Sequence, residues 1–81
     1  MSEPSRTDRY MARVEQHLLT FPRLSDKIGF LDTQIERWDR ESERFEETEG
    51  RSHPGATAFD FAETTAALCA LRGRLTQRSA A

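Results

Sequence analysis

The stretch FPRLSDKIGFLDTQIERWDRESERF, residues 21–45, decides the fold because its apolar residues recur at alternating three- and four-residue steps. Only Ser42 interrupts the series, which consists of Phe21, Leu24, Ile28, Leu31, Ile35, Trp38 and Phe45. This spacing places the apolar side chains on one face of a helix, as in the seam of a coiled coil. The stretch therefore predicts a long helix with one buried face.

Proline and glycine residues set the expected ends of this helix. Pro22 lacks a backbone donor and clashes with a preceding helical turn, but it is well tolerated in the first turn of a new helix. We therefore expect a helix that begins there, capped by Thr20 or Phe21, and ends at Thr48 or Glu49, before a left-handed cap at Gly50. A single helix that kinks at Pro22 is the alternative.

Two further helices are predicted on either side. Upstream, Tyr10, Met11, Val14 and Leu18 recur at helical spacing, which predicts a short helix over about 7–20. Ser5 or Thr7 is suited to cap its N-terminus.

Downstream, the run RSHPGA predicts a loop at about 50–56, followed by a helix over about 57–78. Thr57 or Asp60 is suited to cap this helix. Its apolar face consists of Phe61, Thr64, Leu68, Leu71 and Leu75, flanked by alanines. We predict an all-α fold with a single small domain over 1–81, in which an antiparallel helical hairpin follows a short N-terminal helix. Residues 1–6 are expected to fray.

The size of the chain predicts association. A core built from 81 residues supplies only a few kcal/mol of stability. The single cysteine, Cys69, excludes an internal disulfide, and together with His17 and His53 it gives no zinc-ligand spacing. We therefore predict that the chain associates, either as a homodimer of antiparallel hairpins in a helical bundle or with a helical protein partner.

The predicted partner-binding residues are those of the two seams. They are Leu24, Ile28, Leu31, Ile35, Trp38, Phe45, Phe61, Leu68, Leu71 and Leu75. Charge supports a dimer, because folding back the third helix brings a basic cluster beside Arg23 and Lys27. That cluster is Arg72, Arg74 and Arg78. These like charges repel one another, and the acidic end of a helix from a partner chain would relieve that repulsion.

No residue group has the spacing of a catalytic, cofactor or metal site, so we predict that the protein is not an enzyme and needs no cofactor. Ser52 and His53 are adjacent, but neighbouring residues rarely form a nucleophile and an oriented base. The acidic run between Glu36 and Glu49 is interleaved with arginines, as expected for a solvated helix face. Cys69 is expected to act as a small hydrophobe, and His17 to be partly buried.

Two other features are better functional candidates. Arg6, Arg9 and Arg13 follow at steps of three and four and form an arginine stripe on the first helix. Cations are unfavourable near a helix N-terminus, so the stripe indicates contact with phosphate or with an acidic partner. The second feature is Phe30 and Phe59, which lie outside the main seams and at least one of which needs cover from the first helix or another chain.

Charge and hydropathy limit the expected partners and the expected cellular compartment. The formal net charge is −2 with a pI of about 5.6, so the totals do not imply a general affinity for nucleic acid. No apolar run reaches the roughly 20 residues of a membrane span, and the first residues lack a signal peptide's apolar stretch, so we expect no membrane and a cytoplasmic protein.

The predicted architecture resembles small bacterial helical-hairpin proteins, such as the co-chaperones of type III secretion needle subunits. It also resembles short coiled-coil proteins of phages and mobile elements. Both resemblances are of shape, without signature residues to carry over. The sequence favours a non-enzymatic protein–protein interaction module that binds itself or a partner helix. A small nucleic-acid-associated regulator that uses the arginine stripe is the alternative, although it lacks an aromatic base-stacking surface.

Overall fold

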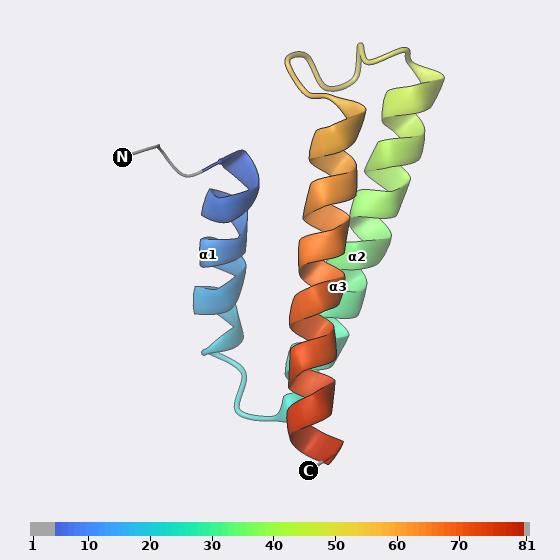
Figure 1. Cartoon of the computed structure of the whole chain (residues 1–81). Coiled ribbons are helices and arrows are strands. Elements are labelled where there is room, and N and C mark those ends of the chain that lie inside the picture. The colour runs from blue at the N-terminus through green and yellow to red at the C-terminus, as the bar shows by residue number, and fades with distance from the viewer. Residues whose placement is uncertain (1–4, 81) are drawn as a thin grey trace.

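The computed structural model describes residues 5–80, with side chains through Arg78. This part of the chain is all-helical, with α1 at Arg6–Leu18, α2 at Leu24–Glu47 and α3 at Ala58–Ala80 (Figure 1). α2 and α3 lie side by side and run in opposite directions, and α1 lies along α3. The all-α class predicted from the sequence is confirmed. Residues 1–4 of the segment expected to fray lie outside the described residues.

The start of α1 follows the expected capping chemistry. The Ser5 hydroxyl accepts a hydrogen bond from the Asp8 backbone N–H, and the Asp8 carboxylate accepts one from the Ser5 N–H. This reciprocal capping box satisfies two N–H groups that the helix leaves open. Ser5 is therefore the cap, whereas Thr7, the other candidate, is buried inside the first turn.

The link between α1 and α2 differs from the prediction. α1 ends at Leu18, and α2 starts at Leu24 after Arg23, so neither Thr20 nor Phe21 caps α2 and Pro22 lies in the link. A kinked continuous helix is also wrong. The physical reason lies in Lys27, whose ammonium group donates hydrogen bonds to the backbone carbonyls of Leu18 and Phe21. These bonds hold the link against the first turn of α2.

The end of α2 is closed by two residues with left-handed backbone. Gly50 has the predicted positive φ of 85°, and Glu49 before it also has a positive φ of 53°. The Gly50 N–H donates to the Phe45 carbonyl at 2.8 Å, and the Glu49 N–H donates to the Glu46 carbonyl. This is a Schellman motif in which a glutamate, not the glycine, occupies its first left-handed position.

The loop over 48–57 then leads into α3, whose N-terminus is capped as predicted. The Thr57 hydroxyl accepts from the Asp60 N–H, and the Asp60 carboxylate accepts from the Thr57 N–H. Thr57 and Asp60, the two cap candidates of the sequence, therefore act together as one capping box.

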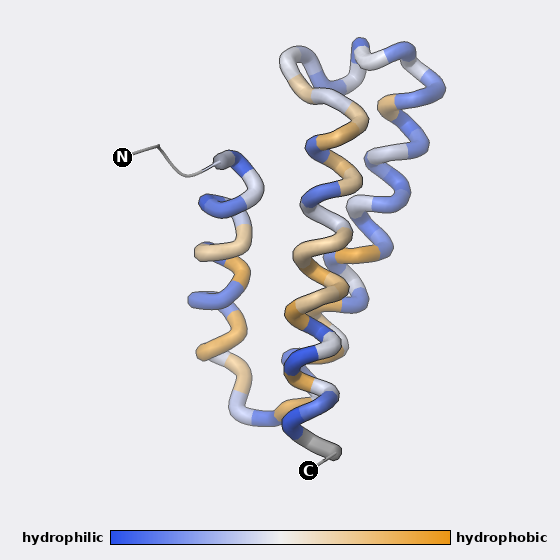
Figure 2. Tube along the Cα trace, viewed as in Figure 1, coloured by the Kyte–Doolittle hydropathy of each residue, from blue (hydrophilic) through white to orange (hydrophobic). Residues whose placement is uncertain are grey.

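The three helices share one core, which is densest in the half of the molecule that α1 covers. Its buried members are Val14, Leu18, Leu31, Leu68 and Leu71. Leu31 and Leu68 are fully buried, with 0% of their surface exposed. Hydrophobic residues concentrate in the lower part of α1 and along α3, whereas the upper half of α2 is mainly hydrophilic (Figure 2). None of the helices in the described part of the chain combines the length and the apolar character of a membrane span.

Candidate functional site: an aromatic cleft with an arginine rim

The site arises from unequal helix lengths. α1 has 13 residues, whereas α2 has 24 and α3 has 23. At 1.5 Å per residue α1 covers only about 20 Å of neighbours that are about 35 Å long. Its first turn is fixed to α3 by a buried hydrogen bond of 3.2 Å between the hydroxyls of Thr7 and Thr64. Beyond this point the groove between α2 and α3 is open.

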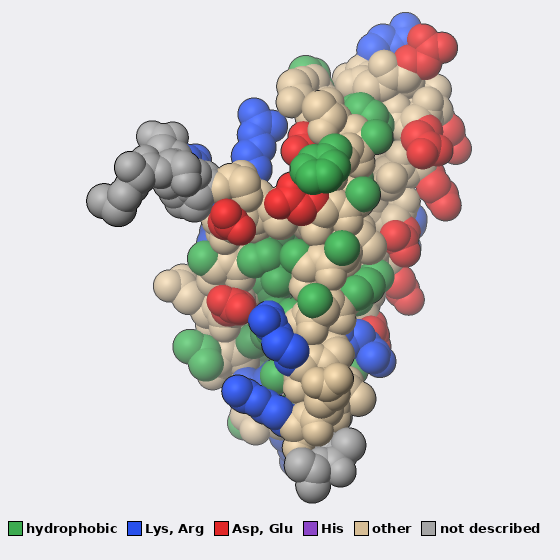
Figure 3. All heavy atoms as spheres, viewed as in Figure 1, with side chains coloured by type: hydrophobic (Ala, Val, Ile, Leu, Met, Phe, Trp, Pro, Cys, Tyr) green, Lys and Arg blue, Asp and Glu red, His purple; other side chains and the backbone are tan. Residues whose placement is uncertain are grey.

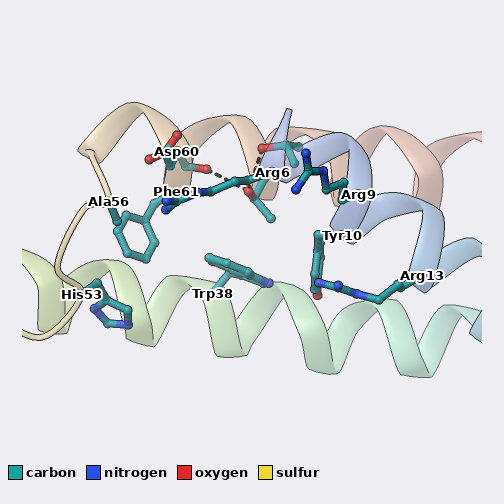
Figure 4. A pocket seen from close by; sticks show the side chains of 11 residues that line it. Arg6, Arg9, Tyr10, Arg13, Trp38, His53, Ala56, Asp60 and Phe61 are labelled. Atoms are coloured by element: carbon teal, nitrogen blue, oxygen red, sulfur yellow. Dashed lines mark hydrogen bonds between the residues drawn. The ribbon is translucent and has the colours of Figure 1, made fainter. Parts of the chain in front are cut away.

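A cleft of about 390 Å³ occupies this opening, which is a volume within the range of small-ligand pockets. It lies between the N-terminal turns of α1 and α3, the middle of α2 and the loop before α3 (Figure 4). Its lining residues are Arg6, Thr7, Arg9, Tyr10, Arg13, Trp38, His53, Ala56, Asp60, Phe61 and Thr64. All three arginines of the predicted stripe belong to this set.

Aromatic rings form the floor of the cleft. Trp38 packs edge-on between Tyr10 and Phe61, at ring-centroid distances of 5.3 and 5.7 Å. The Tyr10 hydroxyl donates to the Gln34 side-chain oxygen, which fixes the tyrosine ring on α2. Tyr10 and Trp38 are half-buried and Phe61 is buried. The floor is therefore a rigid apolar surface, of which the tyrosine and the tryptophan remain partly accessible.

The rim of the cleft is basic. Arg6, Arg9 and Arg13 are all exposed, and Figure 4 shows the Arg6 side chain extending across the cleft toward Phe61. Asp60 lies on the opposite wall, where its carboxylate is engaged in the cap of α3. The lining thus holds three guanidinium groups and one carboxylate, although the whole chain has a net charge of −2.

His53 closes the far end of the cleft in an arrangement that the sequence did not predict. The Ser52 hydroxyl lies 2.7 Å from His53 Nδ1, and His53 Nε2 lies 2.7 Å from the Glu41 carboxylate. The expectation that adjacent Ser52 and His53 would not converge is wrong. Ser52 itself is not among the residues that line this cleft. The three side chains instead fasten the loop over 48–57 to α2.

The predicted seam residues are buried or half-buried within the single chain. Leu31, Phe61, Leu68 and Leu71 are buried. The half-buried ones are Leu24, Ile28, Ile35, Trp38, Phe45 and Leu75. Only Trp38 and Phe61 among the seam residues line the cleft. Their role in binding a partner stays a prediction.

Several other candidate residues lie away from the cleft. Cys69 is exposed and not packed as a small hydrophobe. His17 is also exposed, because it lies over Phe30 at a ring-centroid distance of 4.7 Å without being enclosed. This contact covers Phe30 from α1. Phe59, the other phenylalanine outside the seams, is 71% exposed.

The basic cluster at the end of α3 is partly neutralised within the chain. Arg72 forms an ion pair with Asp32 of α2, so the expected repulsion from Arg23 and Lys27 does not dominate there. Asp32 and Arg72 are 40 residues apart, so their pairing depends on how α2 and α3 align. Among residues 5–80, no group of His, Cys, Asp and Glu side chains is arranged to hold a metal ion.

Comparison with known proteins found no matching family model, no matching curated protein and no matching solved structure. The cleft and its surroundings are therefore the features that point to a function.

Proposed function

We propose that the protein is a non-enzymatic protein–protein interaction module, in which the α2–α3 helical hairpin and α1 together present the cleft to an acidic segment of a partner. The observation that carries this proposal is the union of an arginine rim and an aromatic floor in one opening. Arginine binds carboxylates through paired hydrogen bonds, and an aromatic floor takes up an apolar anchor. The occupant is thus an acidic segment with an apolar or aromatic side chain near its centre.

The proposal is tested with a short blocked peptide that carries a central phenylalanine between glutamates. Trp38 is the only tryptophan of the chain and lies in the cleft, so its emission reports binding directly. We expect saturable binding that weakens about tenfold when the peptide phenylalanine is replaced by alanine. Binding should disappear when lysines replace the glutamates.

Matched variants of the protein separate the cleft from general charge. Arg13→Gln should weaken binding of the glutamate peptide, whereas Arg74→Gln should not. Arg74 is equally exposed but lies outside the cleft. Equal effects of the two variants, or no Trp38 response up to about 1 mM peptide, would contradict the proposal.

A regulator that binds single-stranded nucleic acid is the second candidate, because the structure places aromatic rings beside the arginine stripe. Base stacking needs an open ring face, however, and Tyr10 and Trp38 meet edge to face with an interplanar angle of 75°. Asp60 in the wall also opposes phosphate. An oligothymidine probe in the same fluorescence assay should therefore bind more weakly than the glutamate peptide at about 0.15 M salt. Tighter binding of the oligonucleotide would favour the regulator.

A further inference from the structure

The exposed apolar side chains indicate which acidic segment enters the cleft. Within the described part of the chain, two large hydrophobic residues are strongly exposed, Leu19 at 82% and Phe59 at 71%. Leu19 follows the C-terminal end of α1, at the opposite end of that helix from the cleft. Phe59 lies in the first turn of α3, next to the cleft residue Asp60.

Phe59 has the chemistry that the cleft requires of an occupant. Glu63 follows it by four residues in α3 and therefore shares its helix face, and Asp60 is its neighbour. An exposed aromatic ring with the Glu63 carboxylate on the same helix face matches an acidic segment with an aromatic anchor. Hydrophobic and acidic side chains adjoin at the upper end of α3, while basic side chains lie near the start of α1 (Figure 3).

We propose that the occupant of the cleft is a second copy of this chain, with Phe59 of each copy inserted into the cleft of the other. This inference rests on the proposed function and names the partner of that site. A two-fold axis would form both contacts at once, because each copy carries one anchor and one cleft. The arginine rim of one copy then faces Glu63 of the other.

The proposed dimer differs from a pairing of the two seams. Leu31 and Leu68 are already fully buried within one chain, so these two seam residues have no surface left for a partner. The cleft and Phe59 are accessible without any such rearrangement. Phe59 is 71% exposed, so its insertion into a cleft would remove a large apolar surface from water.

Sedimentation equilibrium of the full chain from about 1 to about 200 µM tests the proposal. Phe59→Ala should raise the dimer dissociation constant by about tenfold or more. Leu19→Ala is the matched control, since it also truncates an exposed hydrophobic side chain, and it should leave the constant unchanged. Both variants should keep the helical circular dichroism of the wild type, because neither side chain is packed.

A charge exchange tests the reciprocal arrangement. Arg13→Glu and Glu63→Arg should each weaken the homodimer, because each places like charges opposite one another. Arg13 is chosen because Arg6 and Arg9 lie in the first turns of α1, where a new carboxylate would also stabilise the helix. An equimolar mixture of the two variants should dimerise again, since both contacts of the mixed dimer pair opposite charges.

Three results would overturn the second copy as the occupant. These are a monomeric wild type at about 200 µM, equal effects of Phe59→Ala and Leu19→Ala, and a mixture that dimerises no better than its components. The glutamate peptide distinguishes this failure from failure of the proposed function. If the wild type stays monomeric but the peptide still shifts Trp38 emission, the cleft binds an acidic partner other than this chain.

Discussion

The two ends of the α2–α3 pair are built differently. At the end covered by α1, leucine and valine side chains enclose one another, and Leu31 and Leu68 are fully buried. At the other end, aromatic rings line an open cleft and a loop is held by polar contacts. Aliphatic side chains stabilise by burial alone, whereas aromatic rings can keep one part packed and another accessible. The covered end is therefore suited to stability and the open end to recognition.

The largest expected effect concerns the covered end. Leu31→Ala removes a fully buried side chain between the three helices and should lower the free energy of unfolding by about 2–5 kcal/mol, which is a large part of the stability of so small a domain. Chemical denaturation followed by circular dichroism measures this loss. The exposed Leu19 provides the control, because Leu19→Ala should change stability by no more than about 0.5 kcal/mol.

A substitution at the open end should reduce binding and leave the stability of the fold nearly unchanged. Arg13→Gln should reduce peptide binding while leaving unfolding within about 0.5 kcal/mol of the wild type. If Leu31→Ala cost less than about 1 kcal/mol, or if Arg13→Gln destabilised the fold as strongly, the division between a stabilising end and a binding end would be wrong.

A second prediction concerns the boundary between the two ends, where Thr7 meets Thr64. The Thr64 hydroxyl donates to the Asp60 carbonyl at 2.8 Å, so its only proton is used. Thr7 must therefore be the donor in the bond between the two hydroxyls. Thr64→Val leaves this buried donor without an acceptor and should cost about 1–3 kcal/mol.

A double-mutant cycle isolates this contact. Thr7→Val removes the donor and leaves only an acceptor with a spare lone pair, so it should cost less than Thr64→Val. The pair Thr7→Val and Thr64→Val together should cost less than the sum of the single changes, because no unsatisfied donor remains. Strict additivity in urea denaturation would show that the hydroxyls do not interact and that α1 is fixed to α3 by its apolar side chains alone.

The sequence predicted the parts of this molecule that depend on local chemistry. The helix-forming spacing from Leu24 to Phe45, the caps at Ser5 and Thr57, and the left-handed Gly50 all follow from nearby residues. The start of α2 was misplaced because Lys27 binds carbonyls up to nine residues earlier, which no capping rule anticipates.

The cleft was only half predictable. The arginine stripe was visible in the spacing of Arg6, Arg9 and Arg13, but the aromatic floor depends on how α1 meets α2. The spacing of the apolar residues placed Trp38 in the seam together with the others. That spacing does not show that α1 is too short to cover the upper part of the groove between α2 and α3. The contact between Glu41 and His53 joins residues that lie 12 positions apart, on either side of a turn. A half-buried contact between residues so far apart in the chain cannot be recognised from sequence spacing.

The smallest expected effect lies at the upper end of α2, where Glu49 adopts a φ of 53°. A left-handed backbone costs a residue with a Cβ about 1–2 kcal/mol, whereas glycine adopts it freely. Glu49→Gly should therefore raise the free energy of unfolding by about 0.5–1 kcal/mol, after the greater entropy of glycine in the unfolded chain is subtracted.

Glu47→Gly is the matched control, because it removes the same exposed carboxylate from the last helical residue of α2. That change should lower stability by a similar amount. Since both variants remove a negative charge from the same helix end, opposite signs in denaturation would isolate the backbone conformation as the cause. If both variants were more stable than the wild type, the loss of the negative charge would be the cause. The left-handed backbone at Glu49 would then store no measurable strain.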